Sequence, residues 1–376
     1  MKLELEQIEL SGIRAFSERY KDQKDTLFMT IGEPDFDTPI EIKDAAKKAL
    51  DDNITHYPPA MGLNQLREKI VSHENKLYKT NYTSNHCIIT NGATESLALA
   101  LWSILEYGDE VIVPIPSFPL YQTQVQLVGA KACLLDTSTH DFQITKAMLD
   151  AHVSDKTKAL LITTPNNPTG TIFSKESNEA MKLFLEENPG VYLIIDEVYR
   201  AMVFGDDYPS MREYPNLTDR IIVVQSFSKS HAMTGWRIGY VLAEENVMDV
   251  MHKLHQNMVT GISTLSQKGA EKALEIEMVE MVETFKARSH YVCQRLTEMG
   301  INYVKPEGGL YVFFSIKEYG LTSFEFGRQL AETVGLVLIP GVYFGTDGFM
   351  RLSFGLPMEE LRKGMDRLES FITQRL

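Results

Sequence analysis

Short apolar runs alternate with amphipathic helical patterns along the first two thirds of the chain. The runs cover residues 87–90, 110–114, 159–163, 191–195 and 221–224. Between them, apolar positions recur at helical spacing after Pro39, over residues 63–78 and 95–105, and up to residue 128. Near-continuous apolar strands that alternate with helices are typical of a parallel sheet buried on both faces. We therefore predict an α/β fold with a mostly parallel sheet sandwiched by helices.

The pattern changes beyond Tyr240. Residues 265–299 form one long helical pattern without proline, which we expect to be a single helix that bends as it passes between domains. Short strand patterns follow at residues 302–304, 310–316, 337–339 and 350–354, with helices near 323–333 and from Met358. These elements predict a smaller α+β domain. We place the large domain at residues 39–275 and the small one at residues 1–38 plus 276–376.

The segment before the large domain is amphipathic. Its apolar positions could dock on its own domain or on a neighbouring subunit, and the sequence leaves both open. They are Leu3, Leu5, Ile8, Leu10, Ile13 and Phe16.

The composition of the chain argues against several classes of function. The chain has 376 residues, 44% hydrophobic and 23% charged, with a formal net charge of -14 and no basic cluster, which argues against nucleic-acid binding. We find no signal peptide and no run long enough to span a membrane, so we expect a cytoplasmic protein that binds no membrane. The three cysteines lack metal or disulfide spacing, and two histidines at helical spacing, His252 and His255, have no third ligand, so no metal is expected.

Residues that could take part in catalysis or ligand binding follow the predicted strands. Gly92, Asn167, Asp196 and Lys229 each come directly or shortly after an apolar run. Because ligands of open α/β sheets bind outside the carboxyl ends of the strands, one edge would gather all four. A carboxylate that ends a buried strand, as Asp196 does, needs a cationic partner such as a pyridinium nitrogen.

The surroundings of Lys229 suggest which ligand lies there. A lysine in a partly dry pocket becomes a nucleophile that can form a Schiff base with a carbonyl. Ser226, Ser228 and Arg237 supply hydroxyls and a guanidinium for a phosphate, and the helix after Gly92 would present free N–H groups to it. Carbonyl and phosphate together describe pyridoxal phosphate. Taken locally, a solvated lysine in a polar loop is an equally good interpretation.

With these residues the chain resembles the pyridoxal-phosphate-dependent class I/II aminotransferases of fold type I, over nearly its whole length. The lysine motif at Ser226 to Arg237 carries the resemblance together with several others in the same order. These are Gly-Glu-Pro-Asp-Phe at 32–36, Tyr57 with Gly62-Leu63 and Leu66-Arg67, Asn-Pro-Thr-Gly at 167–170, Asp-Glu-Val-Tyr at 196–199, Pro340-Gly341 and Arg351.

The resemblance implies a role for each site residue. Lys229 would bind the cofactor covalently and move a proton, and Asp196 would hold the ring nitrogen. Tyr199 and Asn167 would contact the ring oxygen, and Phe118 would stack on the ring. Arg351 would grip the substrate carboxylate, with Gly32 and Asn167 beside it. The phosphate would be held by Ser226, Ser228, Arg237 and the turn Gly92, Ala93 and Thr94, with Tyr57 reaching over from the second subunit of a homodimer.

The implied activity is a ping-pong transfer of an amino group from an L-amino acid to a 2-oxo acid. A carbon–sulfur β-lyase would use the same motifs. An effector-sensing domain of a transcription regulator would need a fused DNA-binding module, and no basic helix-turn-helix segment fits before Gly32. No arginine lies between Arg237 and Arg288 to read an acidic side chain. We therefore expect aromatic or other apolar donors, with 2-oxoglutarate as acceptor. Tyr121, Phe118, Met258 and Ile262 would lie near the pocket, and Lys253 or Lys268 could still supply a charge.

Overall fold

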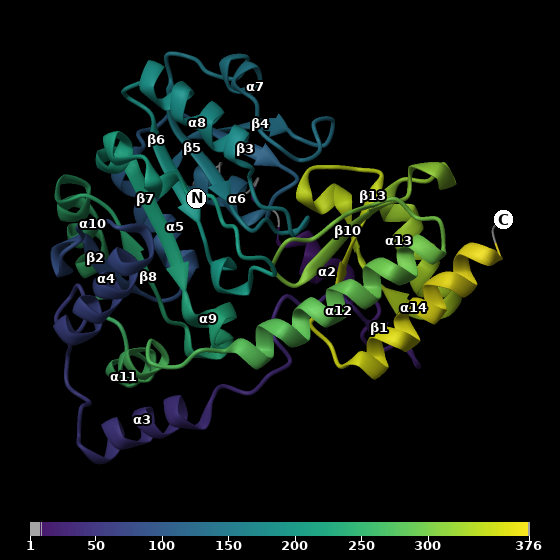
Figure 1. The fold of residues 1–376 in the computed structure, drawn as a ribbon, viewed down its shortest axis with the longest axis horizontal. Coiled ribbons are helices and arrows are strands. Elements are labelled where there is room, and N and C mark those ends of the chain that lie inside the picture. The colour runs from purple at the N-terminus through teal and green to yellow at the C-terminus, as the bar shows by residue number, and fades with distance from the viewer. Residues whose placement is uncertain (1–7, 9, 375–376) are drawn as a thin grey trace.

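The computed structural model describes residues 8 and 10–374, and it has two lobes that are joined by a long helix (Figure 1). The helices are α2 (Gly12–Glu18), α3 (Ile40–Asp51), α4 (Asn64–Tyr78), α5 (Ala93–Ile104), α6 (Leu120–Val128), α7 (Lys146–Asp150), α8 (Lys175–Glu187), α9 (Phe227–Ser230), α10 (Glu245–Met258), α11 (Thr264–Ala273), α12 (Val279–Glu298), α13 (Ser323–Val334) and α14 (Met358–Thr373). No helix among these residues is long and apolar enough to cross a membrane.

A seven-stranded sheet forms the centre of the larger lobe, in the order β2-β8-β7-β6-β5-β3-β4. Its strands are β2 (Cys87–Thr90), β3 (Glu110–Ile115), β4 (Lys131–Asp136), β5 (Thr157–Thr163), β6 (Tyr192–Asp196), β7 (Ile221–Ser226) and β8 (Gly239–Leu242). The pairs among β3 to β7 are parallel, whereas β8 runs antiparallel to both β2 and β7. The predicted α/β class and mostly parallel sheet are therefore confirmed.

The apolar strand residues divide between two cores because successive side chains of a strand point to opposite faces. On β6, Leu193 and Ile195 lie in one buried cluster and Ile194 lies in the other. The first cluster is completed by side chains of α3, α4, α8 and α11, and the second by side chains of α5, α6 and α10. Helices thus cover both faces of the sheet, as continuous apolar strands require.

The smaller lobe is built on an antiparallel sheet in the order β12-β13-β10-β9. Its strands are β9 (Tyr303–Val304), β10 (Tyr311–Ser315), β12 (Ile339–Pro340) and β13 (Phe349–Ser353). The N-terminal segment joins this lobe, because β1 (Leu27–Phe28) pairs with β11 (Leu336–Val337) and the Phe16 ring of α2 is fully buried there. Of the N-terminal apolar positions, Leu3 and Leu5 lie outside the described residues. The bounds of the two domains stay a prediction.

The prediction of a single bent helix over residues 265–299 is wrong. The chain forms α11, breaks at residues 274–278, and continues as α12, which runs toward the smaller lobe in Figure 1. Ile276 packs on a core cluster of the large lobe, while Met278 packs on a core cluster of the small one. The His231 ring also contacts the Ile276 carbonyl oxygen at 3.1 Å. Tertiary contacts on two different cores therefore override a helical sequence pattern.

Candidate active site

The carboxyl ends of the strands in the large sheet open on a cavity of about 830 Å³. The residues that line it come from the loops after β2, β3, β5, β6 and β7, from α2 and the loop after β1, and from β10 and β13 of the smaller lobe. Twelve of the predicted site residues line the cavity: Gly32, Ala93, Thr94, Phe118, Asn167, Asp196, Tyr199, Ser226, Ser228, Lys229, Arg237 and Arg351.

Lys229 lies in α9, the single helical turn that follows β7. Its Nζ donates a hydrogen bond to the Gly32 carbonyl oxygen at 2.6 Å, so the amine points across the cavity toward the smaller lobe's side. Burial lowers the pKa of this amine to about 8, with Arg237 and Arg351 adding to the effect. A lysine of lowered pKa has a neutral, nucleophilic fraction near neutral pH.

Asp196 ends β6 and is almost fully buried. Its carboxylate accepts hydrogen bonds from the Tyr121 hydroxyl at 2.8 Å and from the Val198 backbone N–H at 3.2 Å. Burial nevertheless raises the pKa of Asp196 to about 6. The sequence placed Tyr121 near the pocket only as an apolar wall, and its hydrogen bond to Asp196 was missed because no spacing in the sequence relates α6 to β6.

The hydrogen-bond donors that could bind a phosphate lie together where β7 and β2 end. The Ser226 hydroxyl accepts from the Ser228 backbone N–H at 3.1 Å, and the two hydroxyls lie 2.8 Å apart. Arg237 donates to the Thr234 and Asn91 carbonyl oxygens at 2.9 and 3.4 Å. Gly92 has φ +78, and a Cβ atom there would lie 2.7 Å from the Arg237 guanidinium. This turn leads directly into α5, so the positive end of that helix faces the same corner.

Arg351 on β13 is buried but has no acidic partner among the described residues. It donates to the Asn167 side-chain oxygen at 3.0 Å and to the Thr30 carbonyl oxygen at 2.8 Å. Its Nε has no hydrogen-bond partner, and burial lowers the pKa of the guanidinium. A buried cation whose hydrogen bonds go only to neutral oxygens is prepared to receive an anion.

Tyr311 on β10 was missed by the sequence reasoning. Its hydroxyl lies 3.0 Å from the Tyr199 hydroxyl, and its ring lies 4.3 Å from the Arg351 guanidinium carbon. A Cβ atom on Gly32 would overlap the Tyr311 hydroxyl, so Gly32 must lack a side chain for the loop to pass. The two glycines that precede this strand, Gly308 and Gly309, were the available signal of close backbone approach.

Several expected pocket residues lie elsewhere. Met258 is exposed at the end of α10, and Ile262 is buried in the core cluster that includes side chains of α3, α4, α8 and α11, so neither lines the cavity. Lys253 is exposed on α10, outside the cavity. Tyr57 also lies outside the cavity, with 91% of its side chain exposed.

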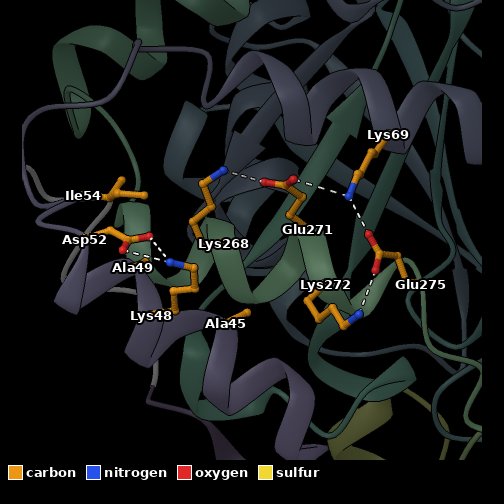
Figure 2. Close-up of a pocket in the computed structure, with 10 residues that line it drawn as sticks. All are labelled: Ala45, Lys48, Ala49, Asp52, Ile54, Lys69, Lys268, Glu271, Lys272 and Glu275. Atoms are coloured by element: carbon orange, nitrogen blue, oxygen red, sulfur yellow. Dashed lines mark hydrogen bonds and ion pairs between the residues drawn. The ribbon is translucent and has the colours of Figure 1, made fainter.

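Lys268, the other lysine considered as a substrate charge, lines a separate pocket between α3 and α11 (Figure 2). Its Nζ lies 2.8 Å from Glu271 and 3.0 Å from Gln65. The other lysines of this pocket are paired in the same way: Lys48 with Asp52, Lys69 with Glu271 and Glu275, and Lys272 with Glu275. Because these charges neutralise one another, Lys268 is not a free cation for a substrate.

A buried lysine of lowered pKa, a buried carboxylate and a cluster of anion donors at one sheet edge are the features of an enzyme that binds a phosphorylated carbonyl cofactor. Comparison with known proteins gives the family. The family model described as aminotransferase class I and II matches residues 24–368. The chain is 40% identical to a probable N-acetyl-LL-diaminopimelate aminotransferase of Bacillus subtilis, over 98% of this chain and 95% of that protein.

Solved structures agree with this result. The crystal structure of an aspartate aminotransferase from Thermotoga maritima superposes with a TM-score of 0.94 at 34% identity, over 99% of this chain and 100% of that one. An aromatic aminotransferase from Pyrococcus horikoshii superposes with a TM-score of 0.90 at 35% identity, over 96% and 99%. The chain belongs to the class I and II aminotransferases. It is an enzyme of the transaminase class, and its cofactor is pyridoxal 5'-phosphate.

The residues present fit this cofactor. The lowered pKa of Lys229 suits an amine that must link to an aldehyde, and the raised pKa of Asp196 marks a carboxylate that lacks a cation. Two serine hydroxyls, the Arg237 guanidinium and the start of α5 supply the donors that a phosphate dianion requires.

Proposed function

We propose that this protein transfers an amino group from an L-amino acid to a 2-oxo acid by a ping-pong cycle, with aromatic and other apolar donors favoured and 2-oxoglutarate as an acceptor. The observation that carries the proposal is the placement of Lys229, Asp196 and Arg351 around one cavity. Burial disfavours the ionised form of each of these three side chains. Such perturbed groups mark the sites of catalysis and ligand binding.

Each residue has a role in the proposed reaction. Bound pyridoxal phosphate supplies an electron-withdrawing ring that stabilises negative charge at the substrate α-carbon. Asp196 would hold a proton on the ring nitrogen, with Tyr121 and the Val198 N–H keeping the carboxylate in place. Lys229 would act first as a general base that takes a proton from the substrate α-carbon. It would then act as a general acid that gives the proton to the cofactor carbon.

Arg351 and Asn167 would orient the substrate. The Arg351 guanidinium would bind the α-carboxylate, and its present hydrogen bond to the Asn167 oxygen at 3.0 Å aligns it. Tyr199, fixed by Tyr311, and Asn167 would hold the ring oxygen, while Phe118 would cover one face of the ring. Ser226, Ser228, Arg237 and the turn Gly92, Ala93 and Thr94 would anchor the phosphate.

The preference for apolar donors rests on the cavity wall. Ile13, Ile31, Leu97, Phe118 and Leu120 line it, and they give an amino-acid side chain apolar surface to cover. The names of the relatives do not agree on a donor. One is called an aspartate aminotransferase and another, from Thermococcus litoralis, an aromatic-amino-acid aminotransferase.

A homodimer with shared active sites completes the proposal. The exposed Tyr57 is bordered by a loop in which Pro58 packs against Gly261, close to the exposed Met258 and Val259 at the end of α10. Large apolar side chains that remain exposed together are common at subunit interfaces. A partner covering this surface would bring Tyr57 to the partner's phosphate. The cytoplasmic location stays a prediction from the sequence.

Half-reactions test the function. The purified protein carrying pyridoxal phosphate is mixed with phenylalanine, methionine or aspartate and no acceptor, and absorbance and product are followed. We expect the cofactor to convert to its amine form with one oxo acid released per site, fastest for the apolar donors. Lys229→Ala should lose ~10²–10⁴-fold or more in rate. Cysteine is added in a separate reaction, in which release of pyruvate and sulfide without this conversion would indicate the β-lyase instead. Fastest conversion by aspartate would contradict the donor preference.

A further inference from the structure

A buried pair of titratable side chains lies behind the turn that faces the phosphate donors. Glu95 is in the first turn of α5 and His255 is on α10, and both are buried. The His255 Nδ1 lies 2.8 Å from Glu95 Oε1. The sequence singled out His255 only with His252, as two histidines without a third ligand. The structure supplies a carboxylate instead, and no group of three metal-ligating side chains occurs in the part of the chain that it describes.

The second oxygen of Glu95 holds the backbone of the turn. Glu95 Oε2 accepts from the Asn91 backbone N–H at 2.5 Å, while the Asn91 carbonyl oxygen accepts from Arg237 at 3.4 Å. The next residue, Gly92, has φ +78 and ψ 172, a conformation that is essentially restricted to glycine. The hydrogen bonds of Asn91 therefore fix the direction in which the chain leaves β2 and enters α5. Because both Glu95 oxygens accept, the His255 ring donates through its Nδ1–H.

The stability of the fold does not account for this pair. The same two helices contribute apolar side chains such as Leu97 and Met251 to one buried cluster. A buried ion pair in such surroundings stabilises a protein no more than apolar side chains of the same size would. The His255 Nε2 is also buried without a hydrogen-bond partner among the described residues, which adds to the cost. A costly pair next to a ligand site indicates a function at that site.

We infer that Glu95 and His255 are positioning residues for the phosphate of the cofactor. The first N–H groups of α5, those of Ala93 and Thr94, have no acceptor within the helix and are the groups that a phosphate would use. A carboxylate at the same helix end is attracted to these N–H groups and would compete with the phosphate. His255 and the Asn91 N–H hold the Glu95 carboxylate on the other side of the turn, so the N–H groups stay free. This inference rests on the cofactor of the family and not on the proposed donor.

Binding of two cofactor forms to the cofactor-free protein tests the inference without relying on turnover. The probes are pyridoxal phosphate and pyridoxal, which has the same ring and aldehyde but no phosphate, and their Kd values are measured by equilibrium dialysis. His255→Phe keeps a ring but cannot donate to Glu95. It should weaken pyridoxal phosphate about 10-fold, the effect of losing one hydrogen bond to a charged group, and leave pyridoxal within about 2-fold. His255→Asn, whose amide nitrogen can replace Nδ1 as the donor, should restore most of the affinity.

Glu95→Ala gives a second route to the same result and should show the same selective loss. If His255 acts through Glu95, the double variant Glu95→Ala with His255→Phe should bind pyridoxal phosphate no more weakly than Glu95→Ala alone. The matched control is His252→Phe, one turn earlier on α10 and half-buried, in which both probes should bind as in wild type.

Three results would overturn the inference. They are an unchanged Kd for pyridoxal phosphate in both His255→Phe and Glu95→Ala, equal weakening of the two probes, and additive losses in the double variant. Failure of the half-reactions would leave these Kd values as they are, so the proposed donor preference and the positioning role of Glu95 and His255 fail separately.

Discussion

Two groups of buried charges meet at the end of β6 and behave in opposite ways. One is a paired cluster of Glu74, Glu197, Arg200 and Arg212, which joins α4 to the loop after β6. The other is the set that lines the cavity, Asp196, Lys229 and Arg351. Glu197 belongs to the first group and its sequence neighbour Asp196 to the second, so a single peptide bond separates the two environments.

In the paired cluster, each charge has its partner. Arg212 contacts Glu197 and lies 2.7 Å from Glu74, which also accepts from Arg200 at 3.1 Å and from the Tyr240 hydroxyl at 2.5 Å. Burial alone would raise the pKa of Glu74, but the two arginines hold it at about 2, and the pKa of Arg212 is raised by Glu197 and Glu74 against the effect of burial. Pairing therefore stabilises the ionised forms.

In the cavity set, the shifts run the other way. Burial lowers the pKa of Lys229 and Arg351 and raises that of Asp196, so each ionised form is disfavoured. The difference teaches how to distinguish buried charges that hold the fold together from those that await a ligand. The former are compensated inside the protein, while the latter are compensated only when cofactor and substrate bind.

Replacing Arg212 by methionine should give the largest change in stability. The substitution leaves Glu197 and part of Glu74 buried without a cation, so the free energy of unfolding should fall by about 3–5 kcal/mol. Urea unfolding of the cofactor-free protein measures it. Arg328→Met is the control, because its pair with Glu332 is exposed and should be worth no more than about 0.5 kcal/mol. Equal losses in the two variants would remove the distinction.

The same kind of substitution at Lys229 should act in the opposite direction. In cofactor-free protein, Lys229→Met removes a buried amine whose charged form is disfavoured, so the free energy of unfolding at pH 7 should rise by about 1–3 kcal/mol. The measurement is the same urea titration. A loss of stability as large as that of Arg212→Met would show that Lys229 is a structural cation.

The pH dependence of stability gives a third test of the contrast, with a smaller expected change in the free energy of unfolding. The pKa of Asp196 is about 6 in the folded protein against an ordinary value of 3.8, so the folded state binds more protons between these values. Its contribution to stability is therefore present below about pH 4 and is lost as the pH rises to 6, by about 1–2 kcal/mol. Comparison of cofactor-free wild type with Asp196→Asn isolates it, since Asn cannot titrate. Parallel stability profiles for the two proteins would contradict it.

The parts of the fold that were predictable depend on local pattern. Apolar strands followed by polar residues placed Asn167, Asp196 and Lys229 at one sheet edge, because parallel strands have their carboxyl ends together. The antiparallel β8 was not foreseen, since Gly239-Tyr-Val-Leu242 carries no mark of strand direction. The break between α11 and α12 depends on which core Ile276 and Met278 reach, and that is a tertiary property.

The candidate site shows the same division. Residues of contiguous motifs, such as Ser226, Ser228 and Arg237, could be read from the sequence. Tyr121 and Tyr311 could not, because their hydroxyls meet Asp196 and Tyr199 across 75 and 112 positions of the chain. Arg14 lines the cavity although it lies far from the other site residues in the sequence, because the smaller lobe brings the N-terminal helix α2 to the cavity.

The central claim is that the unpaired charges of the cavity are completed by pyridoxal phosphate, linked to Lys229. Reduction of the cofactor-loaded protein with borohydride fixes any carbon–nitrogen double bond between an aldehyde and an amine, and mass spectrometry of the peptides then locates it. We predict one cofactor per chain, on the peptide that contains Lys229, and none in Lys229→Met. Cofactor spread over exposed lysines such as Lys253, or an equal amount bound by Lys229→Met, would contradict the account.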